Sequence, residues 1–290
     1  MSEETAPRRE NAFFRRLAHW GALDGPRALV RFSPKPIGAA FGIALPELRR
    51  RIVRNLRSVH GERAGWRNQL DAVTTLANYA ACFAEAIASG REDAEPRVSV
   101  RGKDHLHAAL ARGGVVLVTA HVGPWELTAQ LLGRELTAEV VLVMEREPNV
   151  EAGNLQDRYR SLRGLHVLHI GEHPTDALPL IAHLKKGGVA ALQIDRVPPS
   201  GRVLQVSLFG EAFGAPEGPF RLASLSGAQL VPVFARRLGF FEYELEISEP
   251  IAFARRPSPE ELQAGAQQAI RAMQLFIERS PTQWFHFTGK

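Results

Sequence analysis

Residues 113–120 read GGVVLVTA and are followed at once by HVGPWE, residues 121–126. The first stretch is an apolar, β-branched run opened by two glycines, which predicts a strand buried on both faces. In the second stretch, Gly123 permits a tight turn and Pro124 suits the first position of a helix. A buried strand that leads directly into a helix is typical of a βαβ unit, so this stretch favours an α/β fold.

The same alternation continues after this stretch. Three further apolar runs predict buried strands, at residues 140–144, 165–170 and 189–194. Segments long enough for helices occur between the strands, at residues 125–136 and 175–186. Strands and helices that alternate at this spacing imply crossover connections and a largely parallel central sheet.

Two later strands and a long helix are predicted in the C-terminal part of the chain. The strands lie at residues 229–234 and 243–247, and the second alternates apolar with charged residues, so we expect it at an edge of the sheet or half exposed. Ser258, Pro259 and Glu261 then have the spacing of a capping box, which predicts the start of the helix.

The N-terminal part differs, because residues 12–90 have a helical pattern without strong strand signals. No repeat, low-complexity tract or linker rich in proline and glycine divides the chain. We therefore predict a single domain over residues 1–290, with a helical N-terminal layer (1–95) and an α/β core (96–290). In this fold class, a central mixed, largely parallel sheet is flanked by helices.

Composition excludes several kinds of protein. The chain has 290 residues, of which 45% are hydrophobic, so it can fill a substantial core. Its single cysteine, Cys82, lies in an Ala-rich segment with no histidine close by in sequence, which favours a buried structural thiol over a nucleophile. His166 and His169 would face opposite sides of a strand, so they make a poor metal site, and we expect no metal.

Charge and hydropathy leave the partner of the chain open. The formal net charge is +5, and Arg49, Arg50, Arg51, Arg54 and Arg57 fall within nine residues. Such a cluster can bind nucleic acid, rest on anionic lipid headgroups, or be the solvated face of a helix. No apolar run reaches the ~18 residues that a membrane-spanning helix needs. The acidic N-terminus does not resemble a signal peptide, so a cytoplasmic protein is expected.

The motif with the clearest chemistry is His121-x4-Glu126. His121 follows a predicted strand, where side chains of an α/β sheet line the ligand crevice, and Glu126 falls in the first turn of the next helix. A carboxylate on one imidazole nitrogen would leave the other free to take a proton from a hydroxyl nucleophile. On spacing alone, the alternative is a histidine that caps a helix or is satisfied in the core.

Several ordered motifs around this histidine carry a resemblance to a known family. They are Arg51-Ile52-Val53-Arg54-Asn55-Leu56, Ala120-His121-Val122-Gly123-Pro124-Trp125-Glu126, Arg146-Glu147-Pro148, Gln193-Ile194-Asp195-Arg196, Leu208-Phe209-Gly210-Glu211-Ala212, Gly218-Pro219, Val231-Pro232-Val233-Phe234 and Pro281-Thr282-Gln283-Trp284. On these residues the sequence resembles the lysophospholipid acyltransferase superfamily, and within it the lipid A biosynthesis acyltransferase branch.

The resemblance implies an O-acyltransferase that takes a fatty acyl chain from an acyl thioester, on acyl carrier protein or coenzyme A, without a further cofactor. It implies that His121 is the base and Glu126 its orienting carboxylate, with Asp195 as a second acidic candidate. Three arginines are candidates for contacts with phosphate or oxyanion groups: Arg146, Arg163 and Arg196. For each of these arginines, a surface ion pair is the alternative.

Departures from the branch leave the acceptor open. Members commonly begin with a membrane-spanning helix, which we do not expect here, and often have a polar residue where Pro124 stands. We expect a lipid or glycolipid acceptor, no nucleic acid partner, and a peripheral position on the anionic cytoplasmic face of the inner membrane. The alternatives are a lysophospholipid or glycerol-phosphate acceptor, or a non-catalytic relative that binds lipid or acyl carrier protein.

Overall fold

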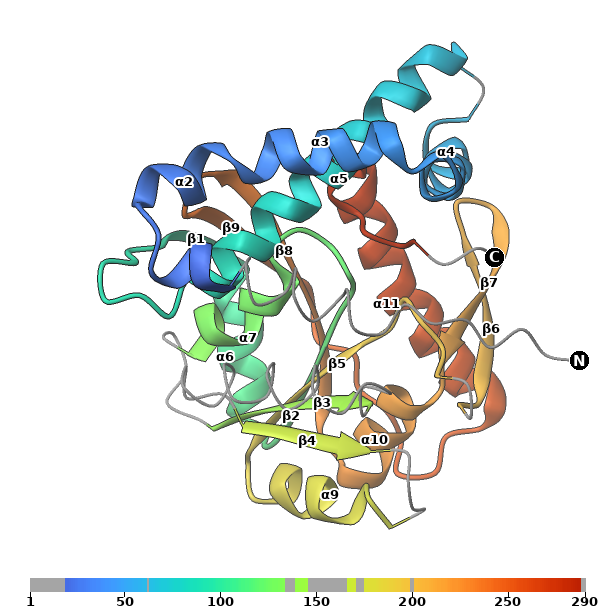
Figure 1. Ribbon diagram of the computed structural model, residues 1–290. Coiled ribbons are helices and arrows are strands. Elements are labelled where there is room, and N and C mark those ends of the chain that lie inside the picture. The colour runs from blue at the N-terminus through green and yellow to red at the C-terminus, as the bar shows by residue number, and fades with distance from the viewer. Residues whose placement is uncertain are drawn as a thin grey trace, which may run out of the picture.

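The computed structural model describes residues 19–61, 63–133, 139–145, 166–170, 175–198 and 201–287 (Figure 1). Its helices are α2 (Arg27–Phe32), α3 (Pro34–Ala44), α4 (Pro46–His60), α5 (Gly65–Ala88), α6 (Lys103–Leu110), α7 (Trp125–Gly133), α9 (Leu178–Lys185), α10 (Gly218–Ser226), α11 (Pro259–Arg279) and the 3-10 turn η1 (Pro281–Gln283). Its strands are β1 (Arg97–Arg101), β2 (Val115–Thr119), β3 (Val140–Glu145), β4 (His166–Ile170), β5 (Val189–Gln193), β6 (Val203–Leu208), β7 (Glu211–Pro216), β8 (Gln229–Gly239) and β9 (Glu242–Ile247).

The central sheet has seven described strands in the order β1-β9-β8-β2-β5-β3-β4. Neighbouring strands are parallel except for β8 and β9, which are antiparallel. A separate antiparallel hairpin is formed by β6 and β7. The prediction of a central mixed, largely parallel sheet in an α/β fold is therefore confirmed.

The middle strand β2 explains why the apolar run at residues 113–120 is continuous. Val116 and Val118 belong to the hydrophobic core on one face, which includes residues of α9, α10 and α11. Val115 and Leu117 belong to the core on the other face, with residues of α5, α6 and α7. Because helices cover both faces of the sheet, residues 115–118 of this central strand are all apolar.

The expected edge position of residues 243–247 is wrong. This strand, β9, lies between β8 and β1, and most of its residues are buried. Its charged residue Glu244 is only 6% exposed, because it forms ion pairs with Arg236 and Arg101. The alternating pattern therefore belongs to an interior strand, in which arginine side chains rather than solvent surround the charged carboxylate.

Other boundaries agree with the sequence pattern to within a few residues. The helix predicted at residues 175–186 is α9, and the capping box is present, with the Ser258 hydroxyl accepting from the Glu261 backbone N–H at 3.2 Å. The strands β1, β6 and β7 were not predicted. The seven residues 12–18 of the predicted helical segment lie outside the described part of the chain.

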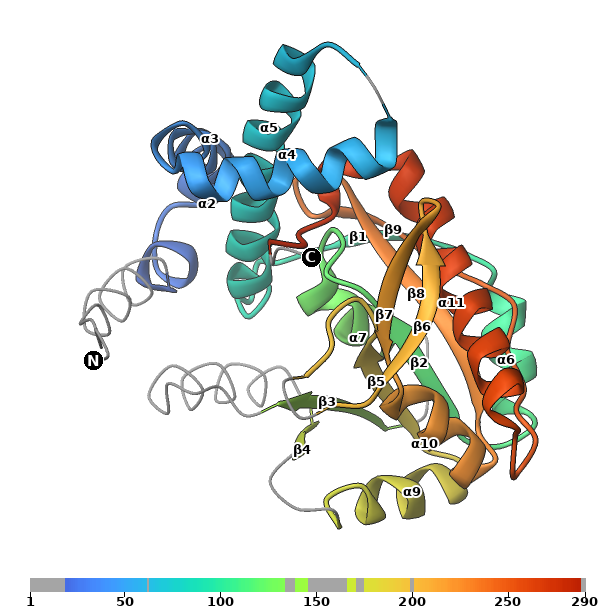
Figure 2. The same ribbon diagram turned by 90° about the vertical axis from the view of Figure 1, so that its right-hand side faces the viewer.

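The described N-terminal residues are helical, as predicted, and pack over one end of the sheet (Figure 2). A buried glutamate of α5, Glu85, ties this layer to the sheet. It accepts hydrogen bonds from the Tyr243 hydroxyl at 2.6 Å and from Arg237 Nε at 2.8 Å. Burial, together with the Glu85 charge, raises the pKa of Tyr243, so the phenol stays a donor. That the whole chain forms one domain stays a prediction.

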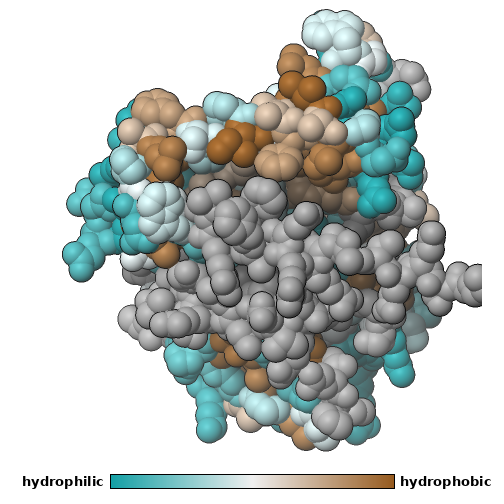
Figure 3. All heavy atoms as spheres, in the orientation of Figure 1, coloured by the Kyte–Doolittle hydropathy of each residue, from teal (hydrophilic) through white to brown (hydrophobic). Residues whose placement is uncertain are grey.

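Hydrophobic side chains also lie on the outer surface of this layer. In Figure 3 they gather along the upper edge of the visible face, where Figure 1 has α2 and α3. In the described residues, no helix is long and apolar enough to cross a membrane.

Candidate active site

His121 and Asp195 lie at equivalent places on neighbouring parallel strands. Thr119, the last residue of β2, is the register partner of Gln193, the last residue of β5. His121 and Asp195 each come two positions later. The His121 Nδ1 is 2.8 Å from the Asp195 Oδ1, and the His121 backbone N–H donates to the Asp195 Oδ2 at 3.0 Å. The carboxylate of Asp195 therefore holds both the imidazole ring and the backbone N–H of His121.

The Asp195 carboxylate is 1% exposed, and it is ionised. Burial alone would raise its pKa, but the charge of His121, the two hydrogen bonds from that residue and the charge of His286 lower the pKa of Asp195 to about 2. A carboxylate can only accept hydrogen bonds, so the proton of the imidazole is on Nδ1. The other ring nitrogen, Nε2, is then the basic one.

The loop after β2 needs the glycine that the sequence pattern singled out. Gly123 has φ +48°, and a Cβ at this position would lie 2.3 Å from the Ala235 carbonyl oxygen. Its N–H donates to the Gln283 carbonyl at 2.8 Å. The residue thus combines a left-handed backbone with close approach to β8, and only glycine fits.

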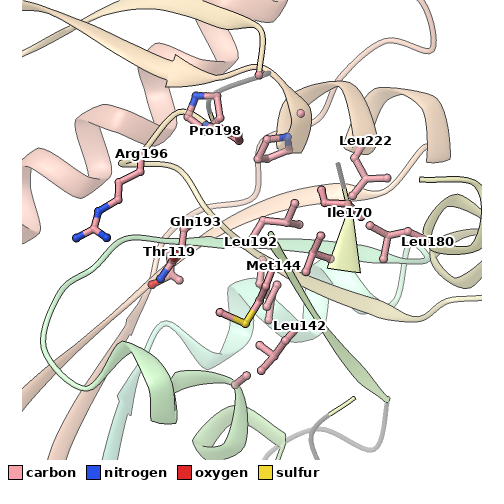
Figure 4. Close-up of a pocket in the computed structure, with 18 of the residues that line it drawn as sticks. Thr119, Leu142, Met144, Ile170, Leu180, Leu192, Gln193, Arg196, Pro198 and Leu222 are labelled. Carbon is pink, nitrogen blue, oxygen red and sulfur yellow. The ribbon is translucent and has the colours of Figure 1, made fainter. Parts of the chain in front are cut away.

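A cavity of about 760 Å³ is lined in part by His121. Figure 4 shows other residues that line it. One end is polar, with Thr119, Gln193 and Arg196 close together. The rest is mainly apolar, and its labelled lining residues are Leu142, Met144, Ile170, Leu180, Leu192, Pro198 and Leu222. A cavity with a polar end and an apolar body suits a molecule with a polar reacting group and a hydrocarbon chain.

Glu126 lines the same cavity, in the first turn of α7. The carboxylate that hydrogen-bonds the His121 ring, however, is that of Asp195. Asp195, the second acidic candidate of the sequence analysis, is thus the carboxylate that contacts Nδ1 of His121. That Glu126 orients the imidazole stays a prediction.

Of the three arginines predicted for anion contacts, Arg196 lies in the site, whereas Arg146 and Arg163 lie outside the described residues. Arg196 donates from Nη2 to the Phe285 carbonyl at 2.9 Å. Among the described residues, its buried Nε has no hydrogen-bond partner. A fixed guanidinium with an unsatisfied donor beside a polar cavity end can bind an oxygen of a ligand.

A segment near the C-terminus completes the site, and sequence reasoning did not assign it a role. The Phe285 N–H donates to the His121 carbonyl at 2.7 Å, and Trp284 forms a β-bridge with Val122. His286 follows, with its Nδ1 3.9 Å from the Asp195 Oδ2. The ordered match ending at Trp284 was the sequence signal for this segment, but no spacing rule brings residue 286 to residue 195.

The arginine cluster of α4 is only partly available to a ligand. Arg49 donates to the carbonyls of Gly42 and Ile43 at the end of α3, and Arg50 pairs with Glu47. The other three are exposed and make no ion pair within the described residues: Arg51, Arg54 and Arg57.

Two other groups give no sign of chemistry. Cys82 is buried, and burial raises the pKa of its thiol, so it is protonated, as expected for a structural residue. In the described part of the chain, no three acidic, histidine or cysteine side chains gather as a metal site would require.

The model of one protein family, bacterial lipid A biosynthesis acyltransferase, matches residues 6–290. The chain belongs to this family. The resemblance inferred from the ordered motifs is thereby confirmed. The histidine, the carboxylate and the cavity described above therefore occur in a member of an acyltransferase family, and acyl transfer is the reaction against which their geometry is interpreted.

Similar proteins include two mycobacterial acyltransferases. Phosphatidylinositol mannoside acyltransferase of Mycobacterium tuberculosis (strain CDC 1551 / Oshkosh) is 33% identical over 137 residues, which are 46% of this chain and 42% of that protein. The protein of the same name from Mycolicibacterium smegmatis is 31% identical over 166 residues, 55% of this chain and 53% of that protein. The matches thus span about half the length of these curated relatives.

A comparison with solved structures finds a match to the 1-acyl-sn-glycerophosphate acyltransferase PlsC from Thermotoga maritima. The similarity has a TM-score of 0.39 at 13% sequence identity and covers 84% of this chain and 97% of that chain.

Proposed function

We propose that this protein transfers a fatty acyl chain from an acyl thioester, on acyl carrier protein or coenzyme A, to a hydroxyl of a lipid or glycolipid. The observation that carries the proposal is the His121–Asp195 pair beside a largely apolar cavity. Family membership supports the acyltransferase chemistry, and the mycobacterial relatives, which are phosphatidylinositol mannoside acyltransferases, favour a glycolipid acceptor.

In the proposed reaction, Nε2 of His121 removes the proton of the acceptor hydroxyl while the hydroxyl oxygen attacks the thioester carbonyl carbon. The tetrahedral intermediate then collapses, the carbon–sulfur bond breaks, and the departing thiolate takes the proton from Nε2. The ionised Asp195 stabilises the imidazolium that exists between these two steps. No nucleophile of the protein is needed, in keeping with the buried Cys82.

Arg196 has a supporting role in this proposal. Its Nη2 is held by the Phe285 carbonyl, which leaves Nε as a donor for the oxyanion or for a phosphate oxygen of a substrate. Glu126 lines the cavity and is proposed to contact the acceptor side of the reaction. No cofactor or metal is part of the proposed mechanism.

A peripheral position on the anionic cytoplasmic face of the inner membrane is proposed as well, because a lipid acceptor resides in a bilayer. The exposed Arg51, Arg54 and Arg57 of α4 support it, since each basic residue near an anionic surface contributes about 1 kcal/mol. Within the same reaction class, a lysophospholipid or glycerol phosphate is the second acceptor.

Transfer of a labelled acyl group from a thioester into a lipid extract tests the proposal. We expect transfer by the wild type, with a loss of about 10²- to 10⁴-fold in His121→Ala. The control is His107→Ala, which removes an exposed imidazole from α6 and should leave the rate unchanged. Equal transfer by wild type and His121→Ala would remove the base assignment. Lipid binding without transfer to any acceptor would favour a non-catalytic relative.

A further inference from the structure

The helix α3 has its small residues inside and its large apolar residues outside. Its buried positions are Pro34, Gly38 and Gly42, at a spacing of four. A Cβ on Gly38 would lie 2.3 Å from the Leu76 carbonyl oxygen of α5 and would clash with it. The glycines therefore let α3 pack closely on α5, and little hydrophobic side chain is buried there.

The rest of the surface of α3 is largely apolar and exposed. Phe41 is 53% exposed and Ile43 is 69% exposed, and Phe32 of α2 is 64% exposed. We call the exposed side chains of α2, α3 and the residue after it the apolar ridge, and its members are Leu29, Phe32, Ile37, Phe41, Ile43 and Leu45. An ordinary surface helix buries its large apolar residues and exposes polar ones. The exposure of large apolar side chains here therefore indicates a surface that contacts a partner or a membrane.

The charges within the segment that forms the ridge are positive, and the acidic residues that flank it are Asp24 and Glu47, of which Glu47 pairs with Arg50. Residues 25–46 contain Arg27, Arg31 and Lys35 and no acidic residue, and all three basic side chains are exposed. The guanidinium of Arg31 lies 5.2 Å from the centre of the Phe32 ring, so a cation sits directly against the ridge. Large apolar side chains bordered by cations fit an anionic lipid headgroup layer with acyl chains beneath it.

Two exposed tryptophans lie in the same N-terminal layer. Trp20 precedes α2 and is 61% exposed, and Trp66 in the first turn of α5 is 64% exposed. Tryptophan favours the region between headgroups and hydrocarbon, because its ring is apolar and its N–H is a donor. Cations, large apolar side chains and tryptophans are together the composition of a surface that lies in the interface of a bilayer.

We infer that the apolar ridge is the surface on which this protein docks to an anionic lipid bilayer, with Phe32, Phe41 and Ile43 entering the interface. The arginines of α4 then add electrostatic attraction, and the ridge supplies the part of the binding that salt does not screen. The inference rests on the proposed function, because docking on a bilayer would bring the protein to its lipid acceptor. The docking itself does not require acyl transfer.

Flotation with vesicles of equal amounts of phosphatidylcholine and phosphatidylglycerol tests the inference, at low and at high salt. The test variant is Phe41→Gln with Ile43→Gln. The matched control is Leu178→Gln with Leu275→Gln, two exposed leucines of α9 and α11. We expect the bound fraction of the test variant to fall about tenfold at both salt concentrations, whereas the control binds as the wild type does.

A second readout follows the position of the ridge in the bilayer. In Phe41→Trp, brominated lipids should quench the added fluorescence, beyond the quenching of wild-type tryptophans. Unchanged vesicle binding by the test variant, or no added quenching, overturns the inference. So does a wild-type dimer, seen by sedimentation without vesicles, that the test variant converts to monomer, because a second copy would then cover the ridge.

Failure of the docking surface and failure of the proposed reaction give different results. If the proposed reaction is wrong, no acyl transfer is found, yet the difference in vesicle binding between the test and control variants persists. If the docking surface is wrong, transfer to a detergent-dispersed acceptor and transfer to a vesicle-embedded acceptor respond equally to the test variant. We expect the test variant to retain the first and to lose about tenfold in the second.

Discussion

The Nδ1 of His121 lies 2.8 Å from the Oδ1 of Asp195, although the two residues are 74 positions apart in the sequence. The contact exists because β2 and β5 are parallel neighbours in register, so that residues two positions past each strand meet at the same edge of the sheet. A side chain fixed at the end of a buried strand is held more rigidly than one in a long loop. The central sheet therefore holds His121, the proposed base, in place relative to Asp195.

Asp195→Asn should lower kcat by about 10²- to 10⁴-fold with a small effect on KM, because the amide neither fixes the Nδ1–H tautomer nor stabilises the imidazolium. Steady-state acyl transfer from a labelled thioester measures both constants. Glu126→Gln is the comparison, and we expect its main effect on KM for the acceptor. A larger fall in kcat for Glu126→Gln would return the orienting role to that residue.

The stability of the fold should depend on pH through Asp195. Its pKa is lowered from 3.8 to about 2 in the folded protein, so ionised Asp195 stabilises the fold above pH 3.8 and this contribution is lost as the pH falls toward 2. The shift corresponds to about 2 kcal/mol. Urea unfolding of wild type and Asp195→Asn over this range measures it. Parallel pH dependences of the two proteins would contradict the assignment.

Gly123→Ala should destabilise the protein by about 2 to 4 kcal/mol and reduce acyl transfer, because the new Cβ meets the Ala235 carbonyl in a left-handed backbone. Gly133→Ala is the matched control, since a Cβ at the end of α7 meets nothing within 4 Å. We expect the control to unfold within about 1 kcal/mol of wild type. Thermal unfolding separates the two, and equal effects would show that the loop after β2 relaxes freely.

Leu142→Trp should shift the preference of the enzyme toward shorter acyl chains. Leu142 lines the apolar body of the cavity, so a larger ring occupies space that the acyl chain would fill. Each methylene that is no longer buried costs about 0.8 kcal/mol. Competition between short and long acyl thioesters in one reaction measures the preference. The variant should keep its rate with the short donor, and an unchanged ratio would mean that the chain lies elsewhere.

The strands of the sheet were predictable where burial on both faces requires a continuous apolar run, as in β2, and the start of α11 was predictable from its capping box. The position of β9 was not. Its glutamates suggested solvent, but Glu244 is buried against two arginines, and such a pairing depends on strands that the sequence does not order. Pattern therefore predicts burial better for apolar residues than for charged residues.

The candidate site was predictable in its histidine and only in part in its other members. His121 follows from the strand-to-helix transition, which is local. The Asp195 contact depends on which strand lies beside β2, and the support from Phe285 depends on where the chain returns after α11. These are non-local pairings, and spacing along the chain contains no information about them.

The segment from Gln283 to His286 also has a consequence for how the protein becomes active. It follows every strand of the sheet along the chain, yet it hydrogen-bonds the backbone of His121 and Gly123. During synthesis the sheet can therefore form, and bring His121 to Asp195, before the loop around the histidine has its last partner. We expect a chain truncated before Gln283 to contain both members of the pair and yet to lack the backbone contacts that hold the loop around His121.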